Sequence, residues 1–136
     1  MKNFGLIGLL LLSICLAWSC TNDRSNTAEV KVVTAEEMET ILELEDVQLV
    51  DVRTAEEYAE IHIPNAQNID FNSPTFDEDV EKLDKKKPVI LYCKSGGRSA
   101  KCAKKLKDAG FKKIYDLEGG ISKWQHSDKI KLERKS

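Results

Sequence analysis

The chain has 136 residues, enough for one domain with a modest core and too few for two. Its formal net charge is −2 and its pI is near 5.8, which argues against nucleic acid as a partner. Once a leader holding Cys15 is removed, the cysteines that remain are Cys20, Cys93 and Cys102. Their odd number and their lack of metal-ligand spacing argue against a disulfide framework and against a zinc site.

Residues 1–19 are predicted to be a signal peptide of the lipoprotein type. The start is positively charged, and the apolar run from Phe4 to Trp18 is about fifteen residues, too short for a comfortable membrane span. The run ends in small residues before a cysteine, which resembles a bacterial lipoprotein signal and implies a lipid on Cys20. We therefore expect an exported, periplasmic or cell-surface protein anchored to a membrane by that lipid. An ordinary secretory leader and an uncleaved anchor helix are the alternatives, and both also export the domain.

The rest of the chain divides into three parts. Residues 20–29 are polar without periodicity and are expected to be a tether. Residues 30–127 form the folded domain. Residues 128–136 are a charged tail that we expect to fray.

In the first half of the domain, short apolar strands alternate with helices that start at capping boxes. Thr34 with Glu37, and Thr54 with Glu57, have the spacing in which a side chain and a backbone N–H satisfy each other. Strands are predicted at 30–33 and 47–52, with a turn and a further short strand within 61–69. Helices are predicted at 34–44, 54–59 and 75–83.

The second half is organised around one loop. The apolar run 88–92 predicts a buried strand, and the loop Cys93-Lys94-Ser95-Gly96-Gly97-Arg98 follows it. An amphipathic helix is predicted from Ser99 to Ala109, ended by Gly110. One more strand at 112–117, a turn at two glycines and a final helix at 121–126 complete the domain.

This alternation predicts an α/β fold: a mainly parallel sheet with helices on both faces. In open sheets of this kind the site lies outside the carboxyl ends of the strands. Asp51, Cys93 and Asp116 are all predicted at such ends.

The loop after Cys93 is suited to holding negative charge. Backbone N–H groups that open a helix lack intrahelical partners, and Gly96 and Gly97 let the backbone curl around whatever the loop holds. The guanidinium of Arg98 is expected to close this ring of donors. A thiol in such a ring has its pKa lowered, so Cys93 is predicted to be a nucleophilic thiolate.

Together, four separated stretches resemble the rhodanese-type sulfurtransferases, over roughly residues 30–126. They are Leu91 to Ser99, Asp51 to Tyr58, His62 to Ile69, and Leu117 to Trp124. The family usually has Gly where Ile61 stands and often has Gly where Asn65 stands. Asn tolerates a left-handed conformation, so that turn is expected to survive.

The resemblance implies a rhodanese-like three-layer fold and a thiosulfate sulfurtransferase. Cys93 would take the outer sulfur of thiosulfate or a similar donor as a persulfide and pass it to cyanide, a thiol or a protein acceptor. The substrate-binding residues would be Lys94, Ser95, Gly96, Gly97, Arg98 and Ser99. Neither a cofactor nor a metal is needed, and we expect a monomer.

Two other function classes are alternatives. A phosphatase or arsenate reductase also uses a Cys-to-Arg loop for oxyanions, but four residues separate Cys93 from Arg98 here and that version has five. A non-catalytic rhodanese-like binding module is the second alternative, although inactive relatives typically lack the cysteine.

Several other polar residues are interpreted as structural. Asp51 and Arg53 are expected to form a charge pair near the end of the sheet, with Glu57 one helical turn along. His62 and His126 lie in no motif that would activate a thiol. Cys102 is expected in the core, with a resolving thiol as the alternative, and Trp124 is expected in the core as well.

Overall fold

The computed structural model describes residues 27–135. The predicted signal peptide, the predicted lipidation site at Cys20 and most of the predicted tether lie outside the described residues. Among residues 27–135, none of the helices combines the length and the apolar character that a membrane span requires.

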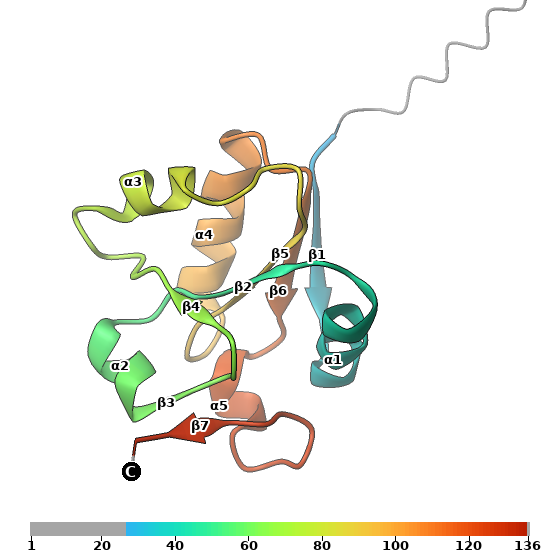
Figure 1. The fold of residues 1–136 in the computed structure, drawn as a ribbon, viewed down its shortest axis with the longest axis vertical. Coiled ribbons are helices and arrows are strands. Elements are labelled where there is room, and N and C mark those ends of the chain that lie inside the picture. The colour runs from blue at the N-terminus through green and yellow to red at the C-terminus, as the bar shows by residue number, and fades with distance from the viewer. Residues whose placement is uncertain (1–26, 136) are drawn as a thin grey trace, which may run out of the picture.

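Across the described part of the chain, five parallel strands form the central sheet (Figure 1). Their spatial order is β1 (Glu29–Val33), β6 (Lys113–Leu117), β5 (Val89–Tyr92), β2 (Gln48–Asp51) and β4 (Gln67–Asn68). The predicted parallel sheet is therefore confirmed. Because β5 lies in the middle, the loop that follows it opens at the centre of the sheet's carboxyl edge.

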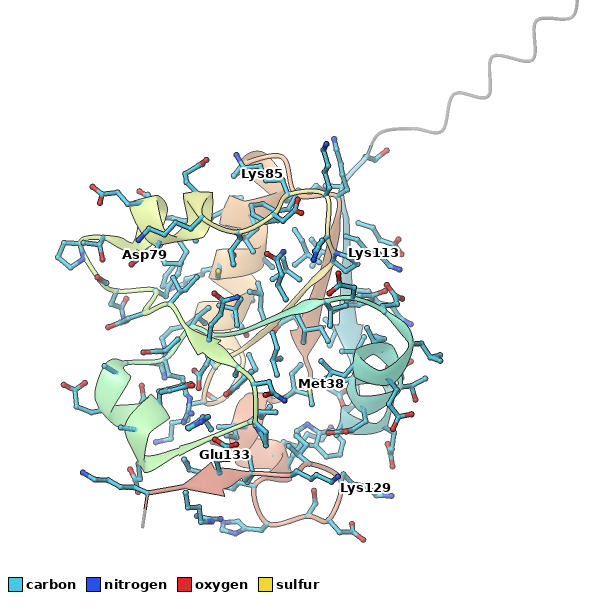
Figure 2. All side chains as sticks on the ribbon, in the orientation of Figure 1. Met38, Asp79, Lys85, Lys113, Lys129 and Glu133 are labelled. Atoms are coloured by element: carbon cyan, nitrogen blue, oxygen red, sulfur yellow. The ribbon has the colours of Figure 1, made fainter. Side chains whose placement is uncertain are left out.

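Helices cover both faces of the sheet, as predicted (Figure 1). On one face α3 (Phe76–Glu81) and α4 (Gly97–Asp108) bury side chains such as Val80 and Leu106. On the other, α1 (Ala35–Leu44) and α5 (Gly120–Trp124) contribute Met38 and Ile121. Met38 projects from α1 into the molecule and is fully buried, whereas Lys129 lies at the periphery (Figure 2). Two apolar layers thus hold the sheet rigid beneath the loop.

The capping boxes predicted from sequence are both present. Thr34 and Glu37 start α1, and Thr54 and Glu57 start α2 (Ala55–Glu60), with each threonine accepting from the glutamate's backbone N–H. Asn65 has a φ of 64°, so the left-handed turn expected at this residue is also confirmed.

The tail differs from its prediction. Residues 128–136 were expected to fray, but β7 (Glu133–Arg134) pairs antiparallel with β3 (Ile61–His62), and Ile130 is buried. The side chain of Glu133 faces β3, where the His62 Nε2 lies 2.9 Å from a Glu133 oxygen (Figure 2). The sequence did not predict this strand because its residues are charged and show no apolar periodicity. Its stability comes from pairing with a strand distant in the sequence.

Candidate active site

Cys93 directly follows β5 and turns its sulfur into the loop. The backbone N–H of Gly96 donates to the Cys93 Sγ at 3.0 Å, and the thiol donates to the Ser99 hydroxyl at 3.4 Å. The Ser99 hydroxyl in turn donates to the Gly96 carbonyl at 3.2 Å. Cys93 is only 1% exposed, so the sulfur sits at the bottom of the loop.

The surroundings of this sulfur favour the thiolate. Burial acts to raise the pKa of Cys93, but the hydroxyl of Ser99 and the backbone N–H groups of Ser99, Gly96 and Ser95 outweigh it. The pKa of Cys93 therefore lies below its ordinary value. The ring of donors expected from the sequence is present.

Gly96 makes the close turn that this ring needs. Its φ is +103°, a left-handed conformation that a side chain disfavours, and it immediately precedes α4. The free N–H groups at the start of α4 consequently face the sulfur.

The floor of the loop is built by α5. The N–H groups of Ile121 and Ser122 donate to the carbonyls of Cys93 and Lys94, both at 2.9 Å. A Cβ on Gly120 would lie 2.5 Å from the Lys94 carbonyl oxygen, so only glycine allows this approach. The sequence predicted only a turn at Gly119 and Gly120 and did not indicate that Gly120 allows α5 to approach the active loop.

Arg98 is held by Glu57 of α2. Its Nη1 and Nη2 donate to the two carboxylate oxygens at 2.7 and 2.9 Å, a bidentate pair. Arg98 thereby lowers the pKa of Glu57 to about 2. The sequence did not predict this bidentate pair; it indicated Glu57 near Asp51 and Arg53, and Arg98 at the ring of donors. The charges of Glu57 and Arg53, and of Arg98 and Cys93, do interact.

The charge pair of Asp51 and Arg53 is confirmed. The Arg53 Nη2 donates to Asp51 Oδ2 at 2.7 Å, and both side chains are almost fully buried. Arg53 also donates to the Ile61 carbonyl. The pair therefore ties the end of β2 to β3 beneath the loop, which is a structural role.

Two titratable groups lie behind the thiol. Burial raises the pKa of Cys102 to about 12, and the residue is 1% exposed, so the predicted core position is confirmed. Asp116 at the end of β6 is 7% exposed, and its Oδ1 has no hydrogen-bond partner among the described residues. Burial raises the pKa of Asp116, while the nearby Ser99 hydroxyl partly lowers it.

The outer side of the loop is open to solvent. Lys94 and Ser95 are exposed, and Lys94 borders a cavity of about 240 Å³ beside the loop. Arg53, Glu57, Ser122 and Gln125 also line that cavity. Within residues 27–135, no group of three or more His, Cys, Asp or Glu side chains gathers as metal ligands would.

The predicted histidine and tryptophan positions are also resolved. His62 stacks on Tyr58 with ring centroids 3.9 Å apart and bridges α2 to β7. His126 lies at the end of α5, where its Nε2 faces the Gln125 amide at 3.2 Å. Trp124 packs against the core only in part and donates to the Glu118 carbonyl at 2.8 Å.

The sequence matches a known protein family. The family model of the rhodanese-like domain matches residues 34–127. The chain is 40% identical over 80 residues to the thiosulfate sulfurtransferase GlpE of Coxiella burnetii, covering 59% of this chain and 73% of the relative. It is also 40% identical over 87 residues to the putative sulfurtransferase YtwF of Bacillus subtilis, covering 64% and 82%.

Solved structures of rhodanese-like proteins have the same fold as this chain. A rhodanese-like domain protein from Staphylococcus aureus is 33% identical with a TM-score of 0.64, covering 76% of this chain and 98% of its own. A rhodanese-related protein from Thermoplasma volcanium is 25% identical with a TM-score of 0.66, covering 76% and 97%. The shared fold therefore extends over the whole domain that carries the loop.

Proposed function

This chain belongs to the rhodanese-like domain family, and we propose that it moves a sulfane sulfur from thiosulfate or a similar donor to cyanide or a thiol through a persulfide on Cys93. The family includes sulfurtransferases, and the relatives named above carry that activity in their descriptions. Beyond membership of the family, we propose the donor, the acceptor and the roles of the individual residues.

One observation carries the proposal: a buried sulfur that faces backbone donors and has a lowered pKa. A thiolate is the reactive form of cysteine toward an electron-poor sulfur. A persulfide places its second sulfur one bond further into the same ring, where the Ser95 and Gly96 N–H groups would hold its negative charge. The tight loop suits a single sulfur better than a tetrahedral phosphate.

The first half-reaction would exchange one S–S bond for another. The Cys93 thiolate attacks the outer sulfur of thiosulfate, the donor's S–S bond breaks, and sulfite leaves with that bond's electron pair. Charge is conserved, because a thiolate and a dianion become a persulfide anion and a dianion. In the second half-reaction cyanide or a thiolate attacks the outer sulfur of the persulfide and releases the Cys93 thiolate.

The other residues of the loop would have distinct parts. Gly96 and Gly97 let the backbone N–H groups converge, and Ser99 holds the sulfur from behind. The exposed Lys94 supplies positive charge at the mouth for an anionic donor, and Arg98 adds a positive charge that Glu57 offsets. A protein that carries an acceptor thiol could reach the loop from the side of Lys94 and Ser95.

The test is the intact mass of the purified domain, residues 27–136, before and after thiosulfate. We expect one added sulfur atom, which cyanide removes and which Cys93→Ser never gains. An unchanged mass with thiosulfate and with organic thiosulfonates would contradict the proposal.

We also propose that the chain is exported and lipidated on Cys20, on the strength of its leader sequence. Labelled palmitate should enter the full-length protein in bacterial cells and fail to enter Cys20→Ser. Equal labelling of both proteins would contradict lipidation at this residue.

A further inference from the structure

The two arginines near the mouth of the active loop are both paired with carboxylates. Arg98 lies in the first turn of α4, directly after the loop, and Glu57 already occupies its guanidinium at two points. The neighbouring guanidinium, Arg53, is occupied by Asp51. The loop therefore does not offer an incoming oxyanion two free cations.

The Glu57 carboxylate occupies the two guanidinium nitrogens through which Arg98 could bind an oxyanion. A carboxylate and a sulfonate engage the fork of arginine with the same two-point geometry. The backbone N–H of Thr54 also donates to Glu57 Oε2 at 3.0 Å, and the Thr54 hydroxyl donates to the same oxygen at 3.2 Å. Glu57 is thus anchored from its own helix and is not easily displaced from Arg98.

Glu57 remains charged under all physiological conditions. The hydrogen bonds from Arg98 outweigh burial and hold the pKa of this carboxyl near 2. An approaching donor consequently meets a fixed negative charge beside Arg98. This charge repels a dianion more strongly than a monoanion or a neutral molecule.

We propose that Glu57 is a specificity-determining residue that selects against dianionic sulfur donors in favour of donors with one negative charge or none. This inference rests on the proposed function for its meaning, because it concerns which donor loads Cys93. Thiosulfate is then a usable but disfavoured donor, and the preferred donor is a less charged sulfane sulfur compound such as an organic thiosulfonate or a persulfide.

The test compares two donors that have the same reacting bond and differ by one charge. Thiosulfate is a dianion and methanethiosulfonate is a monoanion, and both break a bond between a sulfonyl sulfur and the transferred sulfur. Glu57→Gln keeps the side-chain size and can still complete the capping box. Glu56→Gln is the control, because it removes the same charge from an exposed position on the same helix.

In Glu57→Gln we expect the ratio of kcat/KM for thiosulfate to that for methanethiosulfonate to rise by roughly three- to tenfold, the effect of one nearby unit charge in a half-exposed site. Glu56→Gln should change the ratio by less than about twofold. An unchanged ratio in Glu57→Gln, or an equal rise in Glu56→Gln, would overturn the proposal.

A second readout does not depend on sulfur transfer. Iodoacetate and iodoacetamide both alkylate a thiolate, but only iodoacetate is an anion. The ratio of the iodoacetate rate to the iodoacetamide rate at one pH is independent of the amount of thiolate. This ratio should rise in Glu57→Gln and not in Glu56→Gln. If the wild type forms no persulfide while this ratio still rises, the proposed function fails and the charge selection by Glu57 stands.

Discussion

The Cys93 sulfur and the Ser99 hydroxyl lie 3.4 Å apart at the closed end of the active loop. When Cys93 carries a proton, its S–H can donate to Ser99 while the hydroxyl donates to the Gly96 carbonyl. When the proton is lost, the hydroxyl can turn and donate to the thiolate instead. Ser99 is therefore a positioning residue whose hydroxyl adapts to either state.

Replacing Ser99 with alanine should raise the pKa of Cys93, because it removes a donor that favours the thiolate. The rate of alkylation by iodoacetamide at pH 7 should fall by roughly three- to tenfold, with an unchanged plateau at high pH. The measurement is the pH dependence of that rate. Ser95→Ala is the control, since it keeps its backbone N–H; an equal effect in both variants would contradict this role of Ser99.

Arg98→Ala should lower kcat/KM for thiosulfate by about ten- to a hundredfold, because it removes the positive charge that offsets Glu57 and leaves this carboxylate unpaired at the mouth. Arg98→Lys should recover only part of the rate, since an ammonium cannot hold Glu57 at two points. Steady-state kinetics with thiosulfate measure both effects. Wild-type kinetics in Arg98→Ala would mean that Arg98 only anchors α2 to the loop.

Cys102→Ala should leave sulfur transfer within about twofold of the wild type, because the thiol is buried and its raised pKa keeps it protonated. Its free energy of unfolding should fall by about 1 kcal/mol from the lost packing. Urea unfolding and thiosulfate turnover check the two claims. A large loss of turnover in a folded variant, together with a Cys93–Cys102 disulfide in the wild type, would identify a resolving thiol instead.

Arg53→Met should lower the free energy of unfolding by about 3–5 kcal/mol, because it leaves the buried Asp51 carboxylate without its partner. Asp51→Asn combined with Arg53→Met should be less harmful than Arg53→Met alone. Chemical denaturation of the three proteins provides the comparison. Equal stability of the single and double variants would contradict the cost of an unpaired charge.

Asp116 should make the protein less stable as pH rises. Burial raises the pKa of this carboxyl above its unfolded value, so the folded state binds more protons. The stability that protonation provides is complete below the unfolded pKa and is lost as pH rises through the folded pKa. Asp116→Asn should therefore be more stable than the wild type at pH 7, by about 1 kcal/mol, and should lose this pH dependence. Urea midpoints at pH 4 and pH 7 test it, and a less stable variant at pH 7 would count against it.

The fold and the thiol could be predicted because their signals are local. Each signal lies within a few residues of sequence: the two capping boxes, the short β-branched runs and the loop after Cys93. The pairing of Glu57 with Arg98 joins residues 41 positions apart, and either residue alone has several plausible partners. The support of the Lys94 carbonyl by the Ser122 N–H is similarly distant, since it depends on how α5 packs against the loop.

The strand order also determines when the domain around the active loop can be completed during synthesis. Within the described residues, β6 is the sole strand partner of β1, where Val33 pairs with Leu117, although β1 leaves the ribosome first. The floor of the active loop comes later still, from α5. A nascent chain therefore lacks the floor of the active loop until almost all of the domain has emerged. Such long-range closure is slow relative to local folding, so the structure that surrounds Cys93 is completed late.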